Sequence, residues 1–137
     1  MAEACAKSGR AVESVALLAV SKRQPVAVIA ALHELGQQDF GENRLQEALE
    51  KQGALADRAI TWHFIGPVQS NKTSQIAAHF DWVQSVDRPK IIQRLNDQRP
   101  ENMAPLHVCL QVNIDEEPQK AGAPAHALPA LAAQVAA

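Results

Sequence analysis

Short, mostly apolar runs alternate with longer stretches along this chain, and each run ends in polar or turn-forming residues. The runs cover residues 15–20, 38–40, 60–65, 82–86 and 106–114. The first is followed by Ser21-Lys22, the second by Gly41-Glu42-Asn43 and the third by Gly66-Pro67. Continuous apolar runs that end at turns are typical of the buried strands of a parallel sheet. The pattern predicts five such strands.

The stretches between the runs have helical character. They cover residues 25–35, 43–51, 70–79, 88–97 and 129–137. Gly36 ends the first of them, and Asn43 is expected to cap the second, with Gln46 as its capping-box partner. A strand, a helix and two short loops repeat about every 20–26 residues, which is typical of βα units.

Five βα units predict an α/β fold in a single domain that spans residues 1–137. Two architectures remain open: an open doubly wound sheet, or the first five units of a (β/α)8 TIM barrel, which usually takes about 200–250 residues. The chain stops inside an alanine-rich helical stretch, residues 130–137. We therefore expect that the C-terminal part of a larger domain is absent.

Composition excludes several classes of function. The 137 residues are 47% hydrophobic and 20% charged, with a net charge of −2 and no basic block, so the sequence offers no electrostatic case for nucleic acid. No apolar stretch approaches the roughly 20 residues of a membrane helix, and the first residues lack the apolar centre of a secretory signal. Cys5 and Cys109 are far apart, as expected of free thiols in a reducing compartment. We expect a cytoplasmic protein.

Lys22 is the sharpest candidate for chemistry. In both architectures ligands bind at the carboxyl ends of the strands, and Lys22 directly follows the first apolar run. Partial desolvation of its stem would lower the pKa of the amine, and a neutral amine is what a Schiff base with an aldehyde requires. From the pattern alone, a solvated lysine at the start of a loop is the better explanation of the residue.

The other candidates also have plain structural explanations. Asn43 is either a helix cap or an amide that faces a bound ring, and Glu42 is either solvated or paired with a basic group. Alternation places His63 on the opposite face of its strand from Trp62 and Phe64, where a histidine is more often a core residue than a catalytic acid. Gly66 allows a close backbone approach in the loop that follows.

Several familiar sites are missing from the sequence. The histidines show no metal-ligand spacing with cysteine or aspartate, so we predict no metal. The phosphate-binding patterns Gly-x-x-x-x-Gly-Lys and Gly-x-Gly-x-x-Gly are absent, as is the Gly-x-Ser-x-Gly elbow of hydrolases.

Five motifs in order carry a resemblance to a known family. They are LLAVSK at 17–22, DFGENRLQE at 39–47, WHFIGPVQSNK at 62–72, SVDR at 85–88 and QVNI at 111–114. With these motifs, from about residue 13 to Gly122, the chain resembles the pyridoxal phosphate homeostasis protein family. That resemblance implies the alanine racemase N-terminal fold, a TIM barrel that carries covalently bound pyridoxal 5′-phosphate (PLP).

The resemblance also assigns roles to particular residues. It implies that Lys22 holds the cofactor as a Schiff base, that Asn43 lies near the cofactor, and that His63 and Gly66 line the mouth of the barrel. In the family, later loops with Gly-Met-Ser and Arg-Ile-Gly motifs grip the phosphate, and neither motif occurs here. We therefore expect weak binding by a chain of this length alone, and association through its exposed sheet edges.

Three functions follow as alternatives. The first is a protein that binds PLP at Lys22 for cofactor homeostasis and passes it to PLP-dependent apoenzymes, with no established catalytic reaction. The second is an amino-acid racemase, which requires two bases. Related racemases take one from a tyrosine of a second domain, whereas this chain contains no tyrosine. The third is a fragment that no longer binds the cofactor. We expect neither a nucleic-acid partner nor a membrane partner.

Overall fold

Five parallel strands form one sheet in which every strand pairs with the next along the chain. The computed structural model describes residues 1–136. The strands are β1 (Ala19–Val20), β2 (Asp39–Glu42), β3 (Thr61–Phe64), β4 (Trp82–Val86) and β5 (His107–Leu110). All four pairings are parallel. The prediction of a parallel α/β fold is therefore confirmed.

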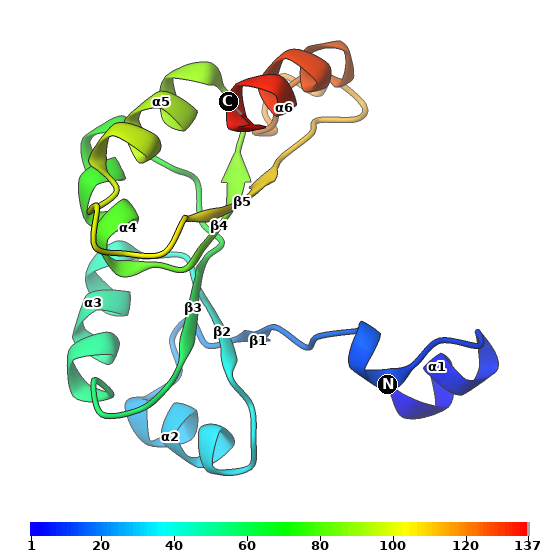
Figure 1. Cartoon of the computed structure of the whole chain (residues 1–137), viewed down its shortest axis with the longest axis vertical. Helices are drawn as coiled ribbons and strands as arrows, with labels where there is room; N and C mark the ends of the chain where they lie inside the picture. Colours follow the sequence, from blue (N-terminus) through cyan, green and yellow to red (C-terminus); the bar gives the residue numbers. More distant parts are fainter. Residues whose placement is uncertain (137) are drawn as a thin grey trace.

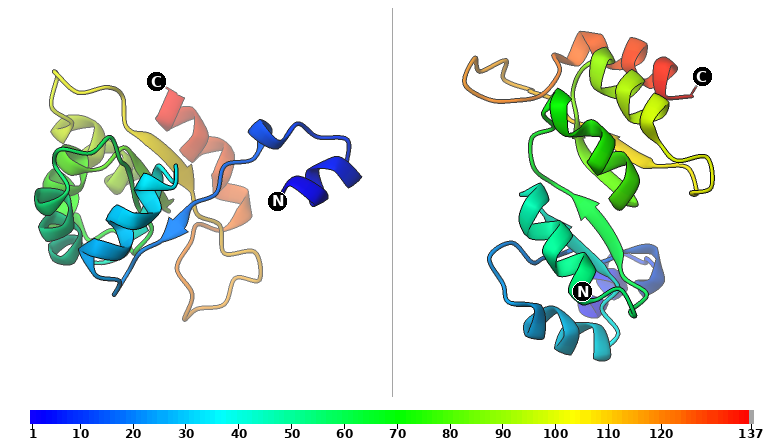
Figure 2. Two further views of the ribbon diagram at one scale, coloured as in Figure 1. Left: turned by 90° about the horizontal axis from the view of Figure 1, so that it is seen from below. Right: turned by 90° about the vertical axis from the view of Figure 1, so that its left-hand side faces the viewer.

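Helices connect the strands and cover one face of the sheet. They are α1 (Ala2–Lys7), α2 (Val26–Glu34), α3 (Leu45–Ala54), α4 (Thr73–His79), α5 (Pro89–Gln98) and α6 (Leu128–Ala136), together with the short 3-10 helices η1 (Val12–Ser14), η2 (Ser70–Lys72) and η3 (Ala125–Ala127). Helices α2 to α5 lie along the outer face, while the opposite, concave face is open (Figure 1). The side view in Figure 2 shows the helices stacked in chain order in front of the strands.

The strand order decides between the two predicted architectures. A doubly wound sheet reverses its strand order at a switch point and carries helices on both faces. Here the order is β1-β2-β3-β4-β5 without reversal, and helices α2 to α5 cover a single face (Figure 1). This is the arrangement of the first five units of a (β/α)8 barrel, with the concave face as the barrel interior.

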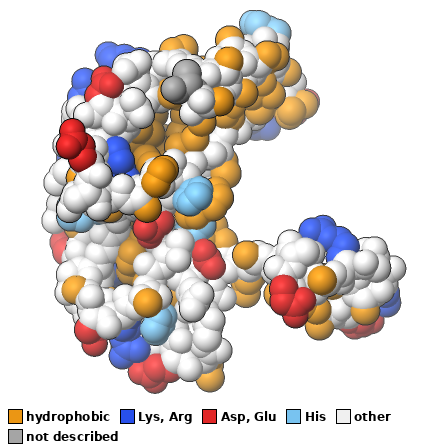
Figure 3. All heavy atoms as spheres, in the orientation of Figure 1, with side chains coloured by type: hydrophobic (Ala, Val, Ile, Leu, Met, Phe, Trp, Pro, Cys, Tyr) orange, Lys and Arg blue, Asp and Glu red, His pale blue; other side chains and the backbone are white. Residues whose placement is uncertain are grey.

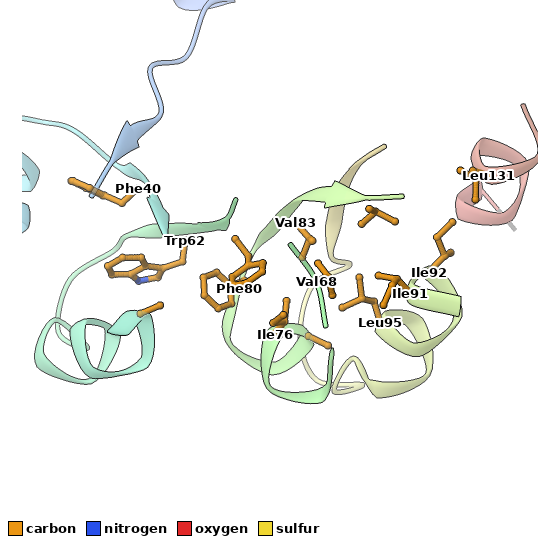
Figure 4. Packing of buried hydrophobic residues seen from close by; sticks show 14 of the residues in the cluster. Phe40, Trp62, Val68, Ile76, Phe80, Val83, Ile91, Ile92, Leu95 and Leu131 are labelled. Atoms are coloured by element: carbon orange, nitrogen blue, oxygen red, sulfur yellow. The ribbon is translucent and has the colours of Figure 1, made fainter. Parts of the chain in front are cut away.

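The hydrophobic core fills the space between the sheet and the helices. Phe40 and Trp62 pair across β2 and β3 with ring centroids 6.2 Å apart. Farther along the same layer, Phe64 meets Phe80 edge-on at 5.2 Å, and Val83 is fully buried. Figure 4 shows Trp62, Phe80 and Val83 in the layer between the strands and the helices. The residues that alternate with them, such as His63, therefore face the concave side.

Two local predictions about the helix expected at residues 43–51, which is α3 in the structure, are wrong. Arg44, not Asn43, occupies the N-cap position of α3, and no side chain makes a capping hydrogen bond there. The helix also continues through Gly53 to Ala54 instead of ending near Lys51. Because the extended residue Arg44 separates Asn43 from the first residue of α3, the amide of Asn43 is not used for capping.

The first and last strands are shorter than their apolar runs. β1 keeps only two residues, and Leu17 before it is 62% exposed. β5 ends at Leu110, and its chain continues through a single bridge between Val112 and Ala123. Both strands lie at the edges of the sheet, where pairing is available on one side only, so less of each run is held in the ladder.

The N-terminal helix stands away from the sheet. α1 is joined to β1 by η1 and an extended segment, and it projects beyond the open side of the sheet (Figure 1). At the other end, α6 packs beside α5, and Ala137, the last residue of the predicted helix 129–137, lies outside the described residues. Across residues 1–136, none of the helices has the length and apolar character needed to cross a bilayer.

Candidate functional site

Lys22 lies in a tight turn directly after β1. The Ser21 N–H donates to the Gly41 carbonyl at 3.0 Å, which continues the ladder, and the Gln24 N–H closes the turn on the Ser21 carbonyl at 2.9 Å. Arg23, the third residue of the turn, has φ 62°, as in a type II turn. The position of Lys22 is therefore set by the turn as well as by the strand.

Lys22 is exposed, so its predicted desolvation is not found in this structure. The physical reason is the open concave face: Val20, just before it on β1, is 51% exposed because no described segment covers that side. Among the described ion pairs and hydrogen bonds of the chain, none involves the Lys22 amine. Within the described residues, the amine is thus not committed to an ion pair.

A buried ion pair lies directly behind the turn, on the helix side. Lys51 of α3 donates from Nζ to Glu42 Oε1 at 2.7 Å, to Glu47 Oε1 at 2.7 Å and to the Ser21 carbonyl at 2.9 Å. Glu42 is fully buried, Lys51 is 5% exposed, and the Ser21 hydroxyl also donates to Glu42 Oε1 at 2.6 Å. Of the two alternatives for Glu42, solvation and pairing with a basic group, the structure shows the second, and the partner is Lys51 on the helix side.

The charges in this cluster shift two pKa values. Burial disfavours the charged form of Lys51, but hydrogen bonds to the carboxylates of Glu42 and Glu47 outweigh it and raise the pKa of Lys51 above its ordinary value. The hydrogen bond from Lys51, followed by the one from the Arg23 N–H, lowers the pKa of Glu47. Both shifts favour the charged forms, so Glu47 and Lys51 stay ionised around neutral pH.

Strand alternation places the predicted site residues relative to the two faces of the sheet. Ala19 packs against the core and Ser21 contacts the buried Glu42, so the residues that alternate with them, Val20 and Lys22, belong to the concave side. On β2, Phe40 and Glu42 are buried toward the helices, which assigns Asn43 to the concave side. Figure 3 shows acidic and histidine side chains gathered in the hollow on this side of the molecule.

We call the carboxyl ends of the strands, where Lys22 follows β1 and Asn43 follows β2, the rim. His63 also faces the concave side, but it lies below this rim. It pairs with Gly41, which is level with Val20, so it sits two residues before the level of Lys22 and Asn43. Its Nε2 is 2.9 Å from Asp39 Oδ1 and its Nδ1 is 3.0 Å from Gln84 Nε2. With the Gln84 amide donating to Nδ1, the Nε2–H donates to Asp39. Both ring nitrogens are therefore engaged within the protein.

A stack of rings extends from His63 across the sheet. His63 lies parallel to Trp82 with centroids 5.5 Å apart and an interplanar angle of 6°, and Trp82 stacks on His107 at 4.5 Å. Trp82 and His107 are the first residues of β4 and β5. The stack therefore forms a layer near the amino ends of the strands, below the rim that carries Lys22.

Gly66 brings the loop after β3 against the backbone after β2. A Cβ built on Gly66 would lie 3.0 Å from both Cα and C of Asn43, and closer still to its carbonyl oxygen. The Ile65 N–H donates to the Glu42 carbonyl at 2.8 Å, and the buried Ser85 hydroxyl donates to the Gly66 carbonyl. The absence of a side chain at Gly66 therefore allows Asn43 and the β3 loop to share the rim.

The structure brings Lys22, Asn43 and Gly66 to one rim and leaves His63 a layer below. Sequence reasoning missed Asp39 and Gln84, which hold His63, and Glu47 and Lys51, which hold the turn. The spacing of Glu47 and Lys51, four apart on one helix, was visible in the sequence. Their contact with the turn was not, because it depends on how α3 crosses β1. Within residues 1–136 no cluster of three or more potential metal ligands was found.

Comparison with known families places the chain among proteins of this architecture. The family model of the alanine racemase N-terminal domain matches residues 4–137, and the chain belongs to this family. The resemblance noted from the five motifs is also confirmed. The chain is 57% identical over 133 residues to the pyridoxal phosphate homeostasis protein of Pseudomonas aeruginosa, with 97% of this chain and 58% of that relative covered. The chain thus spans a little over half the length of this relative.

Solved structures give the same result. PipY of Synechococcus elongatus, determined without PLP, superposes with a TM-score of 0.83 at 39% identity, covering 98% of this chain and 63% of PipY. The structure of PipY with PLP bound superposes with a TM-score of 0.77 at 39% identity, covering 95% of this chain and 62% of PipY. The chain is therefore similar in backbone to a protein solved both with and without this cofactor.

Proposed function

We propose that this chain contributes the covalent anchor of a PLP-binding protein, with the cofactor held as a Schiff base on Lys22, and that the protein serves PLP homeostasis. The observation that carries the proposal is the rim itself. An exposed, unpaired amine follows β1, an uncommitted amide follows β2, and Gly66 holds the neighbouring loop against that amide. The similarity to PipY, whose structure contains PLP, supports the same reading.

Attachment of the cofactor requires few residues besides Lys22. Bound PLP supplies an aldehyde. Lys22 would hold the cofactor by condensing its amine with that aldehyde, with release of one water. No carboxylate pairs with Lys22 among the described residues, so its exposed amine is sterically free to approach the aldehyde. Asn43 offers both a hydrogen-bond donor and an acceptor to a ring substituent. His63, which is held by its hydrogen bonds with Asp39 and Gln84, forms part of the floor of the site below the rim.

The phosphate requires groups outside this chain's rim. An anion of two charges is held by helix N-termini, backbone amides or cationic side chains, and the resemblance assigns that role to loops late in the barrel. Relatives extend well beyond the length matched here. We therefore place the anchor in this chain and the phosphate grip in the remaining units of a closed barrel, in a cytoplasmic protein that exchanges cofactor with PLP-dependent apoenzymes.

Homeostasis is a better account than racemisation for a specific reason. Racemisation removes a proton on one face of the substrate and returns it on the other, which takes two bases. The nearest candidate base, His63, has both nitrogens engaged by Asp39 and Gln84, and the chain contains no tyrosine. Among the described residues, the rim therefore supplies the Lys22 attachment point without a second free base beside it.

A spectroscopic titration with matched lysine variants tests the proposal. In the full-length protein, added PLP should give the visible absorbance band of a protein Schiff base. Lys22→Ala should lose that band at equimolar cofactor. Lys72→Ala, which removes an exposed lysine near Asn43 on the same side of the barrel, should keep it. Equal spectra for Lys22→Ala and the unaltered protein would refute the assignment of the anchor.

A further inference from the structure

We propose that Glu47 and Lys51, fixed from below by the buried Glu42, are positioning residues for Lys22. They hold the turn of residues 21–24 so that the amine leaves β1 in one direction. This inference rests on the proposed function of Lys22. It assigns a role to side chains on the helix side of the sheet, which do not face the cofactor.

Glu47 and Lys51, which we call the clamp, contact the backbone on both sides of Lys22. Before it, the Ser21 carbonyl accepts a hydrogen bond from Lys51 Nζ at 2.9 Å. After it, the Arg23 N–H donates to Glu47 Oε1 at 2.6 Å. Glu47 and Lys51 are one turn apart on α3 and are themselves paired at 2.7 Å. Lys22 is thus the one residue between two backbone groups that are tied to the same rigid helix.

The turn needs such a clamp because its conformation is strained. Arg23 has φ 62°, a left-handed value that a residue with a Cβ adopts at a cost. The turn's own closure is the single hydrogen bond from the Gln24 N–H to Ser21. Without Glu47, the Arg23 N–H loses its acceptor and the left-handed conformation loses its main support. Lys22 would then sample several directions, and fewer of them would face the rim.

Glu42 anchors the clamp to the sheet. Its Oε1 accepts from both Lys51 Nζ and the Ser21 hydroxyl, at 2.7 and 2.6 Å. Its Oε2 is buried and finds no partner among the described residues. A buried ion pair with an unsatisfied oxygen is a poor source of stability compared with an apolar pair of similar volume. Its geometric effect, a fixed position for Ser21 and for the Lys51 amine, is the property that the site uses.

The first test needs no cofactor. Glu47→Ala removes the acceptor of the Arg23 N–H, Glu47→Gln keeps an acceptor oxygen at the same place, and Glu50→Ala is the matched control on the same helix, at an exposed position. Amide hydrogen exchange of Arg23, measured by NMR in the full-length protein, should be about tenfold faster in Glu47→Ala. Glu47→Gln should be near the unaltered protein, and Glu50→Ala should not change.

The second test measures the reaction of Lys22. The rate of Schiff-base formation with PLP, followed by stopped flow, should fall about ten- to a hundredfold in Glu47→Ala, because a misdirected nucleophile loses that much. The melting temperature should change little, since Glu47 is partly exposed. Lys51→Met combined with Glu42→Gln provides a second case, in which the buried charges are removed together and the fold is kept. Its rate should also fall.

The outcomes separate this inference from the proposed function. If the unaltered protein forms no adduct at Lys22, the proposed function fails, and Arg23 exchange still decides whether the clamp orders the turn. If the unaltered protein reacts and Glu47→Ala reacts as fast as Glu50→Ala, the positioning role is overturned. Rescue of both exchange and rate by Glu47→Gln supports it, because a general loss of stability would not follow the presence of one acceptor oxygen.

Discussion

Replacing Gly66 with alanine tests the close approach that joins the β2 and β3 loops. The added methyl carbon would lie 3.0 Å from both Cα and C of Asn43, and nearer to its carbonyl oxygen. All three neighbours are backbone atoms, so no side chain can rotate away. The Gly66 carbonyl is also held by the buried Ser85 hydroxyl. The strain must therefore be relieved by moving the backbone of Asn43 or of the β3 loop.

The expected loss of stability follows from overpacking alone. The φ of Gly66 lies outside the left-handed range, so alanine suffers no conformational penalty there. Forcing one extra methyl group into a tightly packed site costs about 1–3 kcal/mol. Gly53 provides the opposite case: it lies within α3, and a Cβ there meets nothing within 4 Å. Gly53→Ala should raise the free energy of unfolding by about 0.5–1 kcal/mol through helix propensity.

Urea denaturation of the two variants beside the unaltered protein measures both effects. Gly66→Ala should lower the midpoint, Gly53→Ala should raise it, and the slopes should be unchanged. Because Asn43 is displaced in Gly66→Ala, the affinity of this variant for PLP should fall as well. A Gly66→Ala protein that is as stable as Gly53→Ala and binds PLP normally would refute the reasoning that this contact shapes the rim.

Three further predictions concern the core, the clamp and the end of α4. Phe40→Ala, at a fully buried position, should lower the free energy of unfolding by about 3–5 kcal/mol in urea, while Leu35→Ala, 85% exposed, should change it by less than about 0.5 kcal/mol. The pKa of Glu47 is lowered by its hydrogen bonds from Lys51 and Arg23, so its stabilisation is present above the ordinary value of 4.5 and is lost as pH falls through the lowered value. Glu47→Gln should therefore reduce the loss of stability on acidification in thermal melts. Arg99→Lys should cost about 1–3 kcal/mol, because the guanidinium donates at 2.5 and 2.8 Å to the carbonyls of residues 77 and 80; an unchanged melting temperature would contradict this.

The strands could be predicted from the sequence because each is a local pattern. The run at 82–86 matches β4 at both ends, Phe40 before Gly41 marks β2, and the apolar residues before Gly66 mark β3. Local pattern was less informative at the sheet edges. The run at 15–20 yields only a two-residue strand because pairing on one side holds less of it.

The orientation of Asn43 and the pairing of Glu42 with Lys51 could not be predicted from the local sequence. Asn43 has the right chemistry for a helix cap, yet the chain continues for one more residue before α3 begins at Leu45. The choice between capping and facing the rim depends on Gly66, which lies 23 positions further along the chain and contacts the Asn43 backbone. The pairing of Glu42 with Lys51 likewise arises only when α3 folds back over β1 and β2. Contacts between distant segments set these features, and no single stretch of sequence contains them.

The identity of the anchoring nitrogen is the measurement that tests the central claim most directly. The full-length protein would be saturated with PLP, reduced with borohydride to fix the linkage, digested, and analysed by tandem mass spectrometry. The account predicts one pyridoxyl group per chain, carried by the peptide that contains Lys22. A modification found mainly on another lysine, with Lys22 left unmodified, would contradict it.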